Sequence, residues 1–233
     1  MGRLGGPVRG LSRKSSRTDM VSDADRDAER LIVDMIRRER PDDGVLGEEG
    51  ADHEGRSGRS WVLDPLDGTT NFLYGFPAWA VSIAVSDEEG EFAAVVHDPW
   101  REETFRALRG GGAELNEQKV EVRECDDLST ALVATGFGYE ASHRAAQAEV
   151  LQRVLPRVRD IRRAGAASLD LCWVACGRLD AYYERGLKPW DWDAGSLIVA
   201  EAGGALRRLD GDPPCLLAAA SGELLDALAE LVQ

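Results

Sequence analysis

The spacing of apolar residues along the chain first predicts a helix and then a series of strands. In "SDADRDAERLIVDMIRRERP", Ser22 and Asp25 resemble a capping box, and Pro41 ends the helical pattern. The apolar residues at helical spacing there are Ala28, Leu31, Ile32, Met35 and Ile36. Strand-like segments follow, separated by turn residues such as "DEEG": they are "SWVL", "AWAVSIAVS", "EFAAVVHDP", "EETFRALR" and "KVEVRE". This half therefore predicts an antiparallel meander sheet.

The last third of the chain alternates between strand and helix patterns. After the strand "ALVATGF" and a helix around 142–155 come a helix "AASLDLCWVACG", a strand "LDAYYE", a helix "WDAGSLIVAEAGG", a strand "CLLAAAS" and a closing helix "GELLDALAELV". A meander followed by alternation predicts layered sheets with helices between and outside them. We find no repeat or linker, so we expect one domain over 1–233, with 1–18 loosely ordered.

Composition narrows the class of protein. The 233 residues are 43% hydrophobic and 30% charged, as in soluble globular proteins, and no apolar run reaches the roughly 20 residues of a membrane span. The 42 acidic and 28 basic residues give a net charge of −14, which argues against nucleic acid as the main partner and otherwise serves solubility. Four cysteines without a CxxC pair, and a start lacking an apolar signal segment, favour the cytoplasm; a transit peptide is the alternative.

The stretch "WVLDPLDGTTNF" places two carboxylates, Asp64 and Asp67, after an apolar strand. Pro65 cannot continue a strand ladder, so we expect the chain to turn there. Ligands in open α/β sheets bind at such carboxyl ends, and carboxylate oxygens suit Mg²⁺. The "GTT" that follows can begin a helix whose free N–H groups point at an anion. The plainer alternative is a turn in which Asp, Pro and Gly only set backbone angles.

Two other acidic stretches are candidates for the same site. In "VLGEEG", Glu48 and Glu49 lie between glycines, and in "KPWDWDAGS", Asp191 opens a helix. Taken singly, a loop glutamate is usually solvated and an aspartate at a helix start usually caps the helix.

Together, "GEE", "WVLDPLDGTTNF" and "PWDWDAGSLIVAEAGG" resemble the inositol monophosphatase family of Mg²⁺-dependent, lithium-sensitive phosphatases. Their order and separation match, and "RRAGAASLDLCWVACGRLDAYYERG" is similar too. So is "GGGAELNEQKVEV", although Glu117 stands where the family usually has a turn glycine. The resemblance covers about 14–233. It implies an α-β-α-β-α sandwich with an antiparallel meander sheet and a mixed α/β sheet, usually dimeric, that hydrolyses phosphate monoesters.

The resemblance also implies a set of magnesium ligands. By position, Glu49, Asp64 and the backbone carbonyl of Leu66 resemble the ligands of a first ion. Asp64, Asp67 and Asp191 resemble those of a second, and Asp67 and Asp191 also border the substrate. Glu49 would reach a weaker third ion through water, so we expect two or three Mg²⁺ ions.

Substrate contacts follow from the same resemblance. Gly68 and Thr69 match backbone donors to the phosphate, and the Thr69 hydroxyl matches the group that orients the nucleophilic water. Ala166 and Ala167 match the backbone beside the sugar alcohol, and Glu184 matches a carboxylate that binds a substrate hydroxyl. A strand-end carboxylate facing solvent is the alternative for Glu184.

The chain departs from the family pattern in two places. The segment before Lys14 is short and glycine-rich where the family has a longer helix, so we expect a truncated or misassigned start. Asp193 stands where a small apolar residue is usual, and it favours the helix dipole. Lys14 and Asp25 match family positions near the site, although salt bridging or capping explains them. The three histidines are interpreted as structural or surface residues: His53, His97 and His143.

We therefore expect a Mg²⁺-dependent phosphatase acting on a small phosphorylated polyol or sugar, with inositol monophosphate first. Fructose-1,6-bisphosphatase and histidinol-phosphate phosphatase activities are alternatives on the same site. We expect a cytoplasmic homodimer with neither a nucleic acid nor a membrane partner. An alternative of another class is a non-catalytic regulatory partner of the transcription machinery.

Overall fold

The computed structural model describes residues 12–13 and 20–233. The expectations for the segment 1–18 and for Lys14 therefore lie outside the described residues, apart from positions 12–13. The larger sheet has eight strands in the order β10-β9-β8-β7-β6-β5-β3-β4. They are β3 (Gly44–Gly47), β4 (Asp52–His53), β5 (Ser60–Asp67), β6 (Ala80–Asp87), β7 (Gly90–Asp98), β8 (Glu103–Leu108), β9 (Gly112–Leu115) and β10 (Gln118–Val120). All neighbouring pairs are antiparallel except β3 and β5, so the expected meander is present with one parallel pair added.

The smaller sheet has five strands in the order β12-β11-β13-β15-β14. They are β11 (Leu132–Thr135), β12 (Asp160–Arg162), β13 (Ala181–Arg185), β14 (Ala205–Leu209) and β15 (Cys215–Ala219). The first three are parallel and β15 is antiparallel to its neighbours, as expected of a mixed sheet. Two short strands, β1 (Ser12–Arg13) and β2 (Met20–Val21), pair by themselves.

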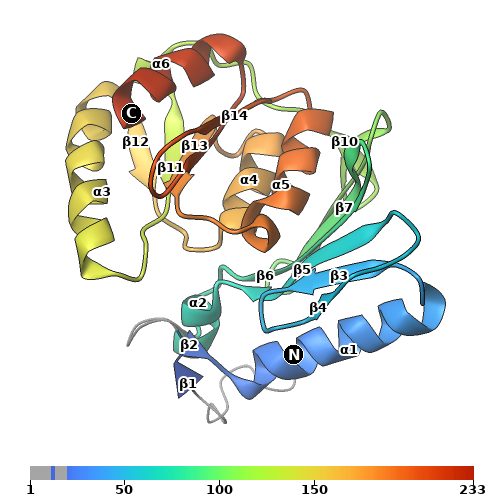
Figure 1. Ribbon diagram of the computed structural model, residues 1–233. Helices are drawn as coiled ribbons and strands as arrows, with labels where there is room; N and C mark the ends of the chain where they lie inside the picture. The colour runs from blue at the N-terminus through green and yellow to red at the C-terminus, as the bar shows by residue number, and fades with distance from the viewer. Residues whose placement is uncertain (1–11, 14–19) are drawn as a thin grey trace.

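Six helices complete the layers, and none is both long and apolar enough to cross a membrane within the described residues. They are α1 (Asp23–Glu39), α2 (Thr69–Tyr74), α3 (Ala141–Val154), α4 (Ala167–Ala175), α5 (Pro189–Glu201) and α6 (Gly222–Val232). Figure 1 shows α1 against the outer face of the larger sheet, α4 and α5 between the sheets, and α3 and α6 outside the smaller one. This arrangement confirms the expected α-β-α-β-α sandwich.

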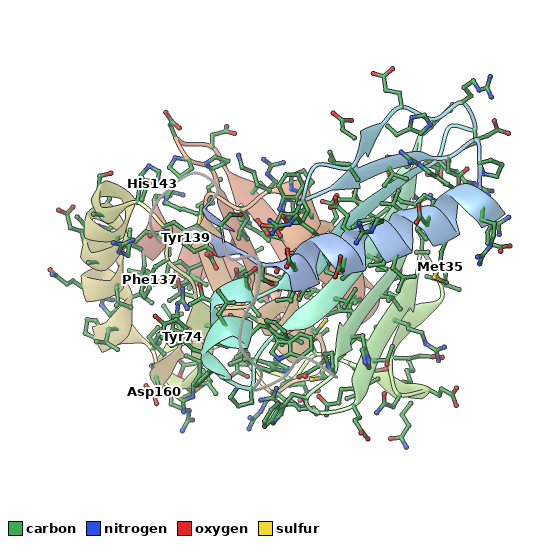
Figure 2. All side chains as sticks on the ribbon, turned by 90° about the horizontal axis from the view of Figure 1, so that it is seen from below. Met35, Tyr74, Phe137, Tyr139, His143 and Asp160 are labelled. Carbon is green, nitrogen blue, oxygen red and sulfur yellow. The ribbon has the colours of Figure 1, made fainter. Side chains whose placement is uncertain are left out.

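The helix α1 begins where its sequence predicts. Ser22 is the N-cap, and its side chain and that of Asp25 form the expected capping box. The buried face, however, carries two acidic residues, Asp25 and Glu29, in line with Val33 and Ile36. Apolar Met35, at the spacing that predicted the helix, is 50% exposed and lies on the outer side (Figure 2).

Two local expectations concern turns. The chain does not leave the sheet at Pro65: β5 continues to Asp67, and an irregularity in its pairing with β6 absorbs the missing N–H donor. Glu117, where the family usually has glycine, has a φ of 67° and sits with Asn116 in the turn between β9 and β10. The backbone there keeps the conformation that glycine adopts most easily, although the residue has changed.

The contact between α4 and α5 depends on a residue without a side chain. A Cβ atom at Gly195 of α5 would lie 2.6 Å from Cδ1 and 2.7 Å from Cβ of Leu171 on α4. Leu171 is fully buried, so its side chain has no free space to move into. The two helices between the sheets can therefore approach this closely because residue 195 is glycine.

We expect Gly195→Ala to lower the free energy of unfolding by about 1–3 kcal/mol, since overpacking at Leu171 outweighs the helix propensity gained from alanine. The measurement is urea unfolding followed by circular dichroism. Gly222→Ala, where no atom lies within 4 Å of the added Cβ, is the matched control and should not lose stability. A more stable Gly195→Ala protein would contradict this account of the α4–α5 contact.

Candidate active site

Asp64 and Asp67 lie together at the carboxyl end of β5 and are nearly inaccessible, with 2% and 8% exposure. Asp64 pairs with Ser82 and Asp67 with Ala80, so three steps on β5 match two on β6. This bulge redirects the strand end. The amide of Leu66 donates to Asp64 Oδ1 at 2.8 Å, which fixes that carboxylate at the bulge.

The neighbouring strand β3 brings a glutamate to Asp64, and it is Glu48, not the expected Glu49. The parallel register pairs Gly47 with Leu63, and the amide of Glu48 donates to the Leu63 carbonyl at 3.2 Å, so the next positions are Glu48 and Asp64. The Glu48 carboxyl lies within hydrogen-bonding reach of Asp64, and its charge acts on Asp67 as well. Because successive side chains point to opposite sides, the register selects Glu48.

The loop that carries these glutamates is held from below by α1. Glu29, 7% exposed, accepts hydrogen bonds from the amides of Glu49 at 2.8 Å and Ala51 at 3.0 Å. A Cβ atom at Gly47 would lie 2.3 Å from Glu29 Oε2, so the approach of this carboxylate needs glycine. The backbone of residue 49 thus belongs to the support of the loop.

Asp67 is anchored at the beginning of α4, a helix 101 positions further along the chain. Its Oδ2 accepts hydrogen bonds from the Ser168 amide at 2.8 Å and the Ser168 hydroxyl at 2.5 Å, and the amide of Ala167 also donates to it. A carboxylate at the N-terminus of a helix satisfies free N–H groups and favours the helix dipole. Ala166, the N-cap of α4, has no capping side chain of its own.

Gly68 completes the junction between α2 and α4. It has a φ of 90°, and a Cβ there would lie 2.9 Å from the Ala78 carbonyl and 3.3 Å from the Ala166 Cβ. The starts of α2 and α4 therefore meet beside Asp67. The structure brings together the expected positions Gly68, Ala166 and Ala167.

Thr69, the first residue of α2, is joined to α1. Its hydroxyl donates to Asp25 Oδ1 at 3.0 Å, with the Leu66 carbonyl at 3.2 Å as a second acceptor. Asp25 is fully buried, and its other oxygen accepts hydrogen bonds from the Ser22 amide and hydroxyl. The capping motif is visible in the sequence, but nothing there shows that the capping carboxylate also reaches Thr69.

Asp191 approaches from the first turn of α5. Its Oδ2 accepts the Lys188 amide at 2.6 Å, and the Ser82 hydroxyl donates to the Trp190 carbonyl at 3.3 Å. Ser82 pairs with Asp64 across β5 and β6, so this contact ties the start of α5 to that strand. The charge of Asp191 acts directly on Asp64.

Burial and mutual repulsion raise the pKa values of these carboxyl groups. Burial raises the pKa of Asp64 well above its usual value, and the charges of Glu48, Asp67 and Asp191 add to the shift. The pKa of Asp67 rises to about 6, because burial outweighs the hydrogen bonds from Ser168. Burial likewise raises the pKa of Asp191 well above normal, against the Lys188 amide, which lowers it.

This donor set fits a magnesium site. Clustered carboxylates gain from a cation because it removes their repulsion, and oxygen ligands are those that Mg²⁺ prefers. Within the described ranges, no three Asp, Glu, His or Cys side chains are already grouped closely enough to enclose one ion. Mg²⁺ usually takes only one or two carboxylates, with water and substrate phosphate as further ligands, so the set remains suitable.

Glu184 lies at the end of β13, on the far side of the same site. Its charge acts on Asp191, and that of Asp67 acts on it. Burial raises the pKa of Glu184 to about 7, while the Tyr182 hydroxyl and Arg163 lower it. Glu184 is half-buried and accepts a hydrogen bond from Tyr182, so a carboxylate that simply faces solvent is not what the structure shows.

The histidines and cysteines take no part in this cluster. His53 is exposed on β4, His97 bonds Thr104 at 2.9 Å, and His143 is exposed on α3 (Figure 2). All four cysteines are free, with Cys172 and Cys215 buried and Cys125 and Cys176 only partly covered.

We expect Glu48→Gln to weaken Mg²⁺ binding by at least about tenfold, since it removes a charge beside Asp64. The matched variant Glu49→Gln should bind Mg²⁺ nearly as the wild type does. Isothermal titration calorimetry with MgCl₂ measures both. The reverse order of the two variants would restore the expectation from the sequence that Glu49 is the ligand.

Asp193, buried in α5, should make stability depend on pH. Burial and the charge of Glu91 raise its pKa to about 7, against Arg208, so the folded state favours the protonated form. This contribution is fully present below about pH 4 and is lost as pH rises through 7. Asp193→Asn should therefore match the wild type at pH 4.5 and exceed it by on the order of 2 kcal/mol at pH 8 in urea unfolding. If the free energy of unfolding differed between the two proteins by the same amount at both pH values, the proposed role of Asp193 would be contradicted.

Comparisons with known proteins identify the family to which the chain belongs. The model of the inositol monophosphatase family matches residues 5–232. The inositol-1-monophosphatase SuhB of Mycobacterium tuberculosis is 47% identical over 231 residues, which are 92% of this chain and 80% of that protein. The Nus factor SuhB of Xylella fastidiosa is 44% identical over 230 residues, covering 94% and 83%.

Solved structures of related proteins have the same fold as this chain. The extragenic suppressor protein suhB of Bartonella henselae superimposes with a TM-score of 0.90 at 37% identity, covering 96% of this chain and 88% of that one. The IMPase of Thermotoga maritima gives 0.89 at 32% identity, covering 100% and 90%. The resemblance drawn from the motifs is confirmed: this chain belongs to the inositol monophosphatase family.

Proposed function

We propose that this chain is a Mg²⁺-dependent phosphatase that hydrolyses a small phosphate monoester by attack of an activated water. The observation that carries the proposal is the convergence of four acidic residues, Glu48, Asp64, Asp67 and Asp191, beside the starts of α2 and α4. Family membership supports phosphatase chemistry, which proceeds mainly by positioning and charge stabilisation.

The Mg²⁺ ions would share these four carboxylates and the Leu66 carbonyl, each ion taking some of them, with Glu48 in the place first expected of Glu49. Bound Mg²⁺ supplies a more acidic water and offsets the charge of the phosphate oxygens. Two ions, with a third bound more weakly, remain our proposal for the count. The hydrogen bonds from Ser168 hold Asp67 in place for this role.

The chain's own groups position the water and the phosphate. Because the Thr69 hydroxyl donates its proton to Asp25, its oxygen lone pairs are free to accept a hydrogen bond from the attacking water. The backbone N–H groups of Gly68 and Thr69, at the start of α2, would bind phosphate oxygens. Both roles depend on the position of Thr69, which the fully buried Asp25 carboxylate holds through its hydrogen bond.

For the substrate we propose inositol monophosphate. Glu184 would accept a hydrogen bond from a substrate hydroxyl, and the backbone of Ala166 and Ala167 would line the same side. Relatives named inositol-1-monophosphatase and a solved structure of an IMPase-II with inositol monophosphate bound support this choice. Fructose 1,6-bisphosphate and histidinol phosphate use the same chemistry, and kcat/KM on the three esters distinguishes them. The homodimer and the cytoplasmic location stay predictions.

A second function, as a regulatory partner of the transcription machinery, is favoured by one observation. Several relatives carry the name Nus factor SuhB. We propose it as an addition to catalysis, because the acidic residues proposed as ligands, Glu48, Asp64, Asp67 and Asp191, are all present in this chain. Capture of RNA polymerase by a protein with Asp64→Asn would show that the partner role is independent of the site. If neither the wild type nor Asp64→Asn captures RNA polymerase, the partner role is excluded.

We expect Asp64→Asn to lower kcat/KM for myo-inositol 1-phosphate by at least about a hundredfold, because Asp64 lies at the centre of the acidic cluster. Phosphate release in millimolar MgCl₂ measures the loss. Asp226→Asn, an exposed aspartate on α6 paired with Arg207, is the matched control and should retain activity. Near wild-type activity of Asp64→Asn would refute the proposed site.

A further inference from the structure

The side chain of Glu184 is held by a tyrosine two positions earlier on the same strand. The Tyr182 hydroxyl donates to Glu184 Oε2 at 2.6 Å. Tyr182 is fully buried among the apolar residues between the two sheets, so its ring cannot move without disturbing that core. Tyr183, between them, packs with the cluster on the opposite face of the sheet, beside α3 and α6.

A second contact confines the same carboxylate oxygen from the adjacent strand. Gly136 follows β11, which pairs with β13 through Thr135 and Tyr183. A Cβ atom at Gly136 would lie 1.8 Å from Glu184 Oε2 and 2.2 Å from Cδ. Bare backbone at residue 136 is therefore a condition for the position that Tyr182 gives to Glu184.

The confined carboxylate faces the acidic cluster. Its charge acts on Asp170 and Asp191, and that of Asp67 acts on it. Asp170 is 1% exposed, and its Oδ1 has no hydrogen-bond partner among the described residues. Asp170 is thus near enough to both Glu184 and Asp67 for the charges of both to act on it.

We propose that Tyr182 and Gly136 are positioning residues that fix the Glu184 carboxylate and thereby set the preference for phosphate esters that carry hydroxyl groups. The inference rests on the proposed phosphatase function and adds the source of its selectivity. A carboxylate has about four lone-pair sites, and the tyrosine fills one while holding the others in a fixed direction. Fixed acceptors lose less entropy when a substrate hydroxyl binds, and they discriminate against esters without it.

The test compares two substrates, myo-inositol 1-phosphate and phenyl phosphate, in millimolar MgCl₂. Tyr182→Phe should lower the ratio of their kcat/KM values by about tenfold, mainly through a higher KM for the inositol ester. Tyr183→Phe removes a hydroxyl from the other face of the same strand and should leave the ratio unchanged. Circular dichroism melting checks that both variants fold.

Gly136→Ala gives a second, independent perturbation, because the added methyl group must displace the end of Glu184. It should lower the ratio in the same direction as Tyr182→Phe. If the wild type hydrolyses both esters and neither variant changes the ratio, the inference fails while the phosphatase proposal stands. A wild type that hydrolyses neither ester overturns both. A ratio that also falls in Tyr183→Phe overturns the assignment to Tyr182.

Discussion

The structure depends on how Asp67 is bound at the start of α4. One carboxylate oxygen accepts hydrogen bonds from the amide and hydroxyl of Ser168, which joins the larger sheet to the layer of helices between the sheets. Burying an anion is costly unless donors surround it, and a helix N-terminus offers such donors without further adjustment. The same bond that docks the two halves of the fold therefore fixes a candidate ligand in place.

The layers explain why so many acidic groups meet at one point. Two sheets with helices between them leave the starts of α4 and α5 next to the end of β5, and α2 begins directly after that strand (Figure 1). Free N–H groups at these starts accommodate negative charge, so carboxylates gather there in spite of their repulsion. What remains uncompensated is the mutual repulsion of Glu48, Asp64 and Asp191, and this repulsion is what a divalent cation would relieve.

The sequence predicted the parts of the site that lie within one motif, but not the contacts between motifs. Asp64 and Asp67 were found because strand, proline and glycine signals surround them. The sequence could not separate Glu48 from Glu49, because which of the two side chains lies beside Asp64 depends on the register of β3 against β5, a tertiary property. Tyr182 was missed for a similar reason: its apolar context predicts a buried strand residue, and only the structure shows its hydroxyl at Glu184.

The helix α1 acts as a brace for the site. Asp25 and Glu29 are one turn apart on its buried face; the first holds Thr69 at the start of α2, and the second holds the loop after β3. Because one helix is hydrogen-bonded to both segments, a movement of that helix displaces both segments together. A small axial slide or rotation of α1 would therefore shift the Thr69 hydroxyl and the loop after β3 in concert, so the shape of the candidate site is linked to the position of a single outer helix.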